Sequence, residues 1–335
     1  MLRKEIYING FSSINPIKDL DEEGDVYRCV EPDYKNYIDT GSVRRLGKIQ
    51  RIALVGAKMC LEDANLIVPD AIITGTGLGC LSDTEKFLGN MLDEEAGLHS
   101  PTSFIQSTHN TISGQIAIML KCHGYNNTYS HRGLSFERAL EDACLLVEEG
   151  TENVLVGAVD EIPESTLRIT QKIKTFHSET NKEEPVAGEG VHYFIIANSK
   201  LHENSIRLLG SSSLAEEVSY EDVVLECNRV LFCAGIEPNE VDTIVLGNNP
   251  GLTEPHYQQL KEELFSHSSV LQFKNLVGES FTASAFGMIL ACKLLSGEVP
   301  DKRFYLKNNN SKAKTVLVYN HFKGTSHSFF ILQNV

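Results

Sequence analysis

A sharp turn between a short strand and a helix is the segment of this chain best suited to chemistry. Residues 127–131 are rich in β-forming residues, Gly133 marks the turn, and apolar residues recur at helical spacing from Phe136 to Val147. A side chain at the tip of such a turn lies at a helix N-terminus, where free N–H groups and the helix dipole favour an anion. Enzymes place Cys or Ser there because the position lowers a thiol pKa and supplies an oxyanion hole. Here the tip is Gly133, which has no side chain that can attack a substrate.

This turn resembles the nucleophile segment of the β-ketoacyl synthases, the condensing enzymes of fatty-acid and polyketide synthesis. In that family a strand ends in Thr-Ala-Cys and is followed by a helix that contains Ala-Leu and a later Ala. Ala139, Leu140 and Ala143 match this helix in register, which places Gly133 at the position of the cysteine. Four further segments resemble family motifs in the same order: the early glycine motif (75–79), the strand after the nucleophile helix (156–161), the Gly-Glu-Gly strand entry (188–190) and the Gly-Phe-Gly-Gly-Thr turn (322–325).

Two further catalytic positions of that family carry other residues here. The family's histidines lie in a His-Gly-Thr-Gly-Thr loop and a Lys-Ser-Asn-Ile-Gly-His loop. The resemblance places Asn248 at the first histidine and Glu279 at the second, with Lys274 and Gly278 retained beside Glu279. The family's reaction needs a thiolate to accept the acyl group and imidazoles to stabilise the enolate formed by malonyl decarboxylation. Glycine cannot supply the first and a charged glutamate opposes the second, so the resemblance implies that all three catalytic residues are lost.

The resemblance also implies a channel and a subunit interface. In the family, the segment equivalent to 107–111 lies beside the acyl channel near the dimer seam, and the strand before the nucleophile pairs with its mate across the two-fold axis. Residues 107–120 contain no Asp, Glu, Lys or Arg, so we expect a helix that is covered on all sides. The expected channel and interface residues are Ser107, Thr108, His109, Asn110, Thr111, Thr128, Tyr129, Ser130, His131 and Arg132.

Each of these assignments has a structural alternative. For His109 it is a satisfied core histidine, and for His131 and Arg132 it is a polar pair at an interface. Phe322 matches the family's gating phenylalanine, and core packing is its alternative. Glu279 stands at the start of a predicted helix, where it is either a general base or a carboxylate that stabilises the helix N-terminus.

Composition excludes several classes of function. The chain has 335 residues and a formal net charge of −15, which argues against binding to nucleic acid or to an anionic membrane. Its eight cysteines are dispersed, with no CxxC pair and no zinc spacing, so we expect neither a metal nor a cofactor. The N-terminus runs directly into a predicted strand without a signal peptide, and no apolar run reaches transmembrane length. We therefore expect a cytoplasmic protein.

Strands and helices alternate along the chain, which predicts a layered α/β architecture. The resemblance sharpens this expectation to the thiolase fold: five layers, αβαβα, with helices between and outside two mixed sheets. We expect two pseudo-repeated halves, 1–204 and 205–335, in one compact unit. The main predicted helices span 46–64, 81–93, 134–149, 219–235, 253–265 and 279–296.

One class of condensing-enzyme relatives also lacks the cysteine. This is the chain length factor, which forms a heterodimer with an active ketosynthase and shapes the channel in which the acyl chain grows. The chain resembles such a subunit, in particular those of aryl polyene or flexirubin-type clusters, and acyl carrier protein would then bind through the complex. Two alternatives stay open: a different enzyme on the same fold, such as a decarboxylase or acyl-transfer enzyme that uses Glu279, and a homodimer that binds an acyl chain or carrier without catalysis.

Overall fold

The computed structural model describes residues 5–17, 26–92, 101–178, 183–249, 254–309 and 312–334. The strands of the N-terminal half are β1 (Ile6–Ile14), β2 (Val26–Tyr27), β3 (Ala71–Gly75), β4 (Tyr125–Tyr129), β5 (Asn153–Asp160), β6 (Ala187–Gly188) and β7 (Gly190–Ala197). Those of the C-terminal half are β8 (Ile206–Leu214), β9 (Thr243–Leu246), β10 (Ser269–Gln272), β11 (Tyr305–Lys307), β12 (Thr315–Phe322) and β13 (Thr325–Asn334). The expected boundary at 204/205 lies in the connection between β7 and β8.

The α-helices are α1 (Thr40–Val43), α2 (Lys48–Asp63), α3 (Leu81–Leu92), α4 (Pro101–Gln106), α5 (Thr111–Leu120), α6 (Ser135–Glu149), α7 (Glu164–Lys172), α8 (Tyr220–Ala234), α9 (Pro255–Glu263), α10 (Lys274–Val277) and α11 (Ala283–Ser296). Short 3₁₀ helices are η2 (Tyr34–Asn36), η3 (Arg132–Leu134), η4 (Pro238–Glu240) and η5 (Lys302–Phe304). None of the helices in the described ranges combines the length and the hydrophobicity needed to span a membrane.

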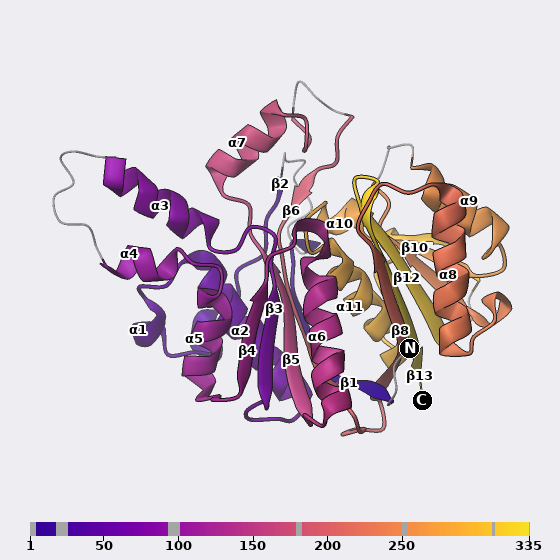
Figure 1. The fold of residues 1–335 in the computed structure, drawn as a ribbon, viewed down its shortest axis with the longest axis horizontal. Helices are drawn as coiled ribbons and strands as arrows, with labels where there is room; N and C mark the ends of the chain where they lie inside the picture. Colours follow the sequence, from indigo (N-terminus) through magenta and orange to yellow (C-terminus); the bar gives the residue numbers. More distant parts are fainter. Residues whose placement is uncertain are drawn as a thin grey trace.

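The two halves share one strand order and one pattern of directions. The order is β1-β7-β5-β3-β4 in the N-terminal half and β8-β13-β12-β9-β10 in the C-terminal half, where β11 adds an edge strand. In each half the first two neighbouring pairs are antiparallel and the next two are parallel. Residues Ile6–Ile8 of β1 pair with Ile206–Leu208 of β8 and join the two expected sheets into one of 11 strands (Figure 1).

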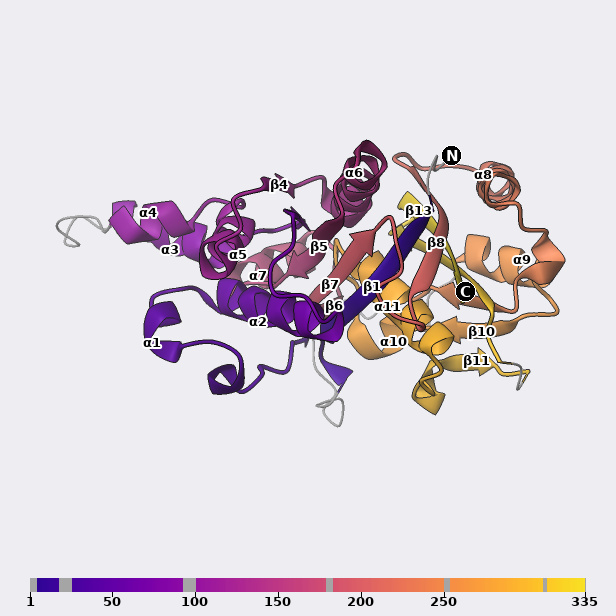
Figure 2. The same cartoon turned by 90° about the horizontal axis from the view of Figure 1, so that it is seen from below.

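Successive side chains of a strand point to opposite faces of the sheet, and helices cover both faces, which produces the five layers. In β5, Val154 and Val156 face the central layer, whereas Leu155 packs on the side of α2. Figure 2 shows α2 and α6 on opposite sides of the N-terminal strands. In the C-terminal half, Phe330 of β13 faces the centre and Phe329 packs on the side of α8. The expected αβαβα arrangement is therefore present.

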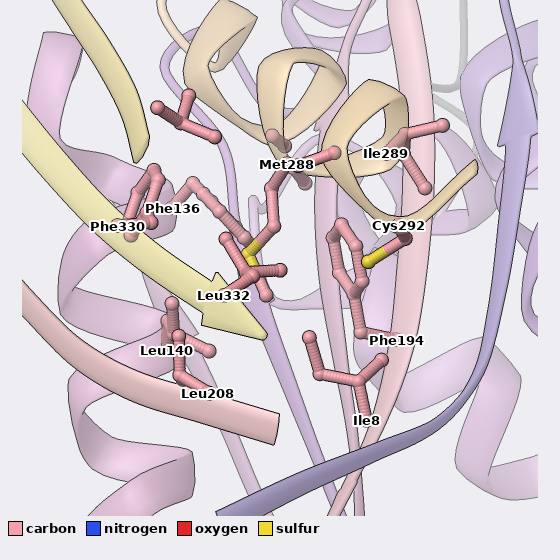
Figure 3. Packing of buried hydrophobic residues seen from close by; sticks show 14 of the residues in the cluster. Ile8, Phe136, Leu140, Phe194, Leu208, Met288, Ile289, Cys292, Phe330 and Leu332 are labelled. Atoms are coloured by element: carbon pink, nitrogen blue, oxygen red, sulfur yellow. The ribbon is translucent and has the colours of Figure 1, made fainter. Parts of the chain in front are cut away.

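The central layer consists of α6 and α11. Figure 3 shows Phe136 and Leu140 of α6 packed with Met288 and Cys292 of α11. Strand residues of both halves surround them, and Phe194 of β7 is the example from the N-terminal half. These side chains belong to one cluster of buried residues, and all five are fully buried. Because α6 and α11 contribute to one core, the segments that precede them are held in a fixed relation.

Two expectations about elements are wrong, and one helix was not predicted. The helix expected from residue 279 begins at Ala283, because Gly278 at φ +74° ends α10 and the chain then runs extended at Glu279. The uncharged helix is not covered on all sides in the chain alone, since Ile118 is 71% exposed. Absence of charge does not imply packing on every face. Helix α7 was not predicted, and Leu167 is its one buried residue.

Candidate functional site

The turn before α6 has the expected strand–turn–helix form. Strand β4 ends at Tyr129, η3 follows, and Gly133 is buried in η3. The hydroxyl of Ser135 holds the turn, because it donates to the carbonyl of Arg132 at 2.7 Å and accepts the N–H of His131 at 2.8 Å. Arg132 has φ +49°, a left-handed conformation that is uncommon for a residue with a side chain. The side chains of His131 and Arg132 are exposed rather than directed into the core.

The space beside Gly133 is occupied by the turn between β12 and β13. A Cβ atom added to Gly133 would lie 2.9 Å from Cβ of Phe322 and 2.9 Å from Cβ of Ser326. These distances are well below van der Waals contact, and the neighbouring atoms are close to the backbone rather than at the ends of flexible side chains. The position that the resemblance assigns to a nucleophile therefore has no room for a side chain unless the hairpin moves.

Aromatic packing fills the same region. Phe322 stacks on Phe281 with ring centroids 4.6 Å apart and an interplanar angle of 26°. Phe281 in turn lies against Gly77, where an added Cβ would be 2.2 Å from Cβ of Phe281. Phe322 also packs against a buried cluster that includes Phe176. Phe322 is thus half-buried against other aromatic rings, and its expected gating role stays a prediction.

Lys274 and Glu279 form an ion pair in the interior. Lys274 Nζ donates to Glu279 Oε2 at 2.8 Å and to the carbonyl of His321 at 2.9 Å, and both side chains of the pair are fully buried. Burial raises the pKa of Glu279, and the Lys274 ammonium opposes this rise. The backbone of Glu279 pairs with Val186 and Gly188, beside the Gly-Glu-Gly segment. Glu279 is therefore anchored by an extended bridge and not by a helix N-terminus.

Asn248 and Asn249 point to different partners. Asn248 Nδ2 donates to Gln272 Oε1 at 3.0 Å and not to Glu279. Asn249 Nδ2 donates to Glu279 Oε2 at 3.3 Å, and its backbone N–H donates to Glu254 Oε2 at 2.6 Å. The sequence analysis missed Asn249 and Glu254, although the adjacent asparagines could have indicated either residue. Residues 250–253 of this loop lie outside the described residues.

Hydrogen bonds to Asp160 join the early glycine motif to the segment before α11 in the central layer. This buried carboxylate accepts hydrogen bonds from the Thr76 and Thr282 hydroxyls and from the N–H groups of Gly77 and Leu78, at 2.9–3.2 Å. Burial raises the pKa of Asp160 to about 6, and these donors limit the rise. Such complete satisfaction is typical of a structural carboxylate.

The buried cysteines offer no substitute nucleophile. Burial raises the thiol pKa of six of them, which opposes formation of the reactive thiolate. They are Cys29, Cys60, Cys80, Cys144, Cys227 and Cys292. All eight cysteines are free. Within the described residues, no group of three or more His, Cys, Asp or Glu side chains is placed to hold a metal ion.

The expected channel segment lies beside the early glycine motif. The ring of His109 packs on Gly79, where an added Cβ would be 2.1 Å from Nδ1. Thr108 is exposed and its hydroxyl lies 2.9 Å from that of Thr111, which donates to the carbonyl of Ile105. Ser107 is half-buried and donates to the carbonyl of Phe104. The segment is therefore ordered by local bonds while part of its surface stays open.

Strand β4 is the outer edge of the N-terminal half. It pairs only with β3 within the described sheet. The N–H of Thr128 bonds to the side-chain oxygen of Asn127 at 2.9 Å rather than to a neighbouring strand, and the Thr128 hydroxyl lies 2.8 Å from that of Ser113. Tyr129 is half-buried and Ser130 is exposed. An open edge of this kind is available for pairing with another chain.

Comparison with known proteins identifies the fold. Residues 34–177, less than half of the chain, match the family model of the β-ketoacyl synthase N-terminal domain. A 3-oxoacyl-[acyl-carrier-protein] synthase 2 from Synechocystis sp. is 24% identical over 159 residues, which are 44% of this chain and 38% of that protein. The sequence match thus spans well under two thirds of the curated relative.

Solved structures match over nearly the whole length. The ishigamide ketosynthase/chain length factor superposes with a TM-score of 0.77 at 16% identity, covering 99% of this chain and all of that one. A ketosynthase in complex with its chain length factor from Xenorhabdus doucetiae gives a TM-score of 0.76 at 15% identity, covering 98% of each chain. The chain therefore has the thiolase-like ketosynthase fold, as the sequence resemblance implied.

Proposed function

We propose that this chain is a non-catalytic subunit, similar to a chain length factor, that pairs with an active β-ketoacyl synthase and shapes its acyl channel in type II fatty-acid or polyketide synthesis. The observation that carries this proposal is the packing around Gly133. Phe322 and Ser326 lie where a nucleophile side chain would project, so the site is filled as well as lacking its thiol.

The buried polar residues also favour a supporting role. Glu279 is fully buried and bound to Lys274 and Asn249. A general base must reach the proton that it removes, and this carboxylate is enclosed by its own ion pair. These contacts count against the alternative in which Glu279 performs decarboxylation or acyl transfer.

The surface offers places for a partner. Besides the open edge of β4, α3 has no buried residue, and Leu92 at its end is 84% exposed. Phe104 and Ile105 of α4, which packs beside α3, are 58% and 60% exposed. Large apolar side chains on a projecting pair of helices are typical of a subunit interface. We propose that the partner covers them, and that acyl carrier protein binds through the complex because this chain is strongly acidic.

Co-purification tests the proposal. We would express the tagged chain in its native cells, identify captured proteins by mass spectrometry, and analyse the acyl products of the isolated complex. We expect to recover a cysteine-containing ketosynthase in equimolar amount. If the segment 107–111 ends the channel, Thr108→Phe should shorten the products, and Thr108→Ser is the control. If the chain belongs to an aryl polyene or flexirubin-type system, the product should be a polyene. Recovery of only a stable homodimer would favour the homodimeric alternative and contradict the proposal.

A further inference from the structure

A cavity of about 580 Å³ lies on the outer face of the N-terminal half. Its lining comes from residues 37–39, Val43 and Leu46, from α2, from the connection between α2 and β3, and from α5. Figure 1 shows α1, α2 and α5 together on the left of the molecule. None of its lining residues belongs to the region around Gly133 or Glu279. Its volume falls in the range of about 300–1,000 Å³ that is typical of small-molecule sites.

The wall of this cavity is mainly aliphatic. Val43 and Leu54 are buried in it, and Met119 of α5 lines it as well. At its mouth stand Ile67 and Ile118, which are 87% and 71% exposed. Tyr37 contributes the one aromatic ring. A wall of flexible and branched alkyl groups suits an extended alkyl chain better than a flat ring, which would be bound by stacking.

A lysine supplies a cationic group in the wall. Lys58 is half-buried, and its Nζ donates to the carbonyl of Tyr37 at 2.7 Å. An ammonium has three N–H donors, so this bond leaves two. No carboxylate of the described residues forms an ion pair with Lys58. Asp39 also lines the cavity, and its carboxylate accepts the N–H of Gly41. A partly desolvated ammonium without a carboxylate partner favours an anionic ligand group.

We propose that this cavity binds an unbranched fatty carboxylate, with the alkyl chain along the aliphatic wall and the carboxylate at Lys58. Burial of each methylene contributes about 0.8 kcal/mol, so affinity should increase with chain length until the cavity is filled. This site is separate from the proposed subunit function, and neither inference requires the other.

Isothermal titration calorimetry of the whole chain with dodecanoate, below its micellar concentration, tests the site. We expect saturable binding of one equivalent, and at least tenfold weaker binding to Ile67→Asp, which places a negative charge at the mouth. The matched control is Ile169→Asp, which makes the same change on α7 at a residue that is 58% exposed. Lys58→Met should weaken dodecanoate about fivefold or more and leave the uncharged methyl dodecanoate unchanged.

Three results would overturn the proposal. The first is no saturable binding of dodecanoate to a folded chain. The second is equal loss of binding in Ile67→Asp and Ile169→Asp, which would indicate adsorption to general apolar surface. The third is loss of self-association in Ile67→Asp without any dodecanoate binding, which would assign the cavity to a protein contact. Equal affinity for the carboxylate and its methyl ester would refute the role of Lys58.

Discussion

The backbone of Gly133 lies so close to Phe322 that a Cβ atom on the glycine would be 2.9 Å from Cβ of Phe322. The two residues come from opposite halves, η3 before α6 and the end of β12. Their contact closes the region where the two halves of this fold meet. If Gly133 stands at the nucleophile position, as we propose, the same contact fills the space that a nucleophile would need, and a restored thiol alone should not restore a site.

We predict that Gly133→Cys destabilises the chain. The new side chain must displace Phe322 or Ser326, and overpacking of this kind costs about 1–3 kcal/mol. Urea unfolding measures the change in the free energy of unfolding. Gly89→Cys is the matched control, because an added Cβ at Gly89 meets nothing within 4 Å. A Gly133→Cys variant as stable as the wild type would mean that the space is open.

The buried Lys274–Glu279 pair should behave as a unit. Glu279→Gln leaves the Lys274 ammonium buried without its counter-charge, which should cost about 3–5 kcal/mol of stability. The double variant Lys274→Met/Glu279→Met should recover most of that loss, because neither charge is then left alone. A double-mutant cycle in urea measures the coupling. The exposed pair of Lys293 and Glu298, 3.1 Å apart, is the control and should couple by at most about 1 kcal/mol.

Additive effects at Lys274 and Glu279, with no recovery in the double variant, would contradict this prediction. Such a result would mean that water or a neighbour such as Asn249 compensates each charge separately.

Glu137 should make stability depend on pH. Burial raises its pKa from 4.5 to about 7, an effect that the neighbouring Ser284 and Ser328 hydroxyls only partly offset. Because the folded-state pKa is above the unfolded one, the folded chain binds more protons between them, and stability falls as pH rises from about 4.5 to about 7. At pH 8, Glu137→Gln should be more stable than the wild type by about 3 kcal/mol, and at pH 4 the two should be similar.

Unfolding of both proteins in urea across this pH range measures the difference. Glu141→Gln changes a carboxyl group that is 56% exposed on the same helix, and it should not alter the pH dependence. Parallel stability curves for wild type and Glu137→Gln would show that Glu137 does not titrate in this range.

Thr128→Pro should weaken association through β4. The substitution removes an N–H that points away from β3 and bonds only to Asn127, so the internal ladder of the sheet stays intact. Thr128→Ala keeps the N–H and serves as the control. Sedimentation velocity over a concentration series should show a larger monomer fraction for the proline variant alone. Identical profiles for both variants near the dissociation concentration would place the interface elsewhere.

The order of elements could be predicted from sequence because strong periodicity and glycine boundaries mark it. The helix from Ser135 to Glu149 agrees with the expected 134–149 to within one residue, and the strand from Asn153 to Asp160 contains all but the last residue of the motif at 156–161. The position of Glu279 could not be predicted. An uncharged run continues from the helix back to residue 280, and only the left-handed Gly278 and the bridge to Ala187 set the start of α11 at Ala283.

Contacts between distant residues were also beyond the sequence. Motif order predicts that Gly133 and Glu279 stand at catalytic positions, but nothing in that order indicates that Phe322 and Ser326 fill the space at Gly133. The same holds for Asn249, which reaches Glu279 while its neighbour Asn248 turns to Gln272. These contacts depend on side-chain packing between the two halves, which cannot be predicted from the local sequence pattern.

The central claim is that this chain does not catalyse condensation. The most direct test incubates the purified chain with an acyl thioester and malonyl thioester on acyl carrier protein, and measures acyl-protein adducts and 3-oxoacyl products by mass spectrometry. A cysteine-containing ketosynthase is the positive control and a sample without protein is the blank. We predict no acyl adduct and no product above the blank for the chain alone. Condensation product formed by the chain alone, and absent from the blank, would contradict the account.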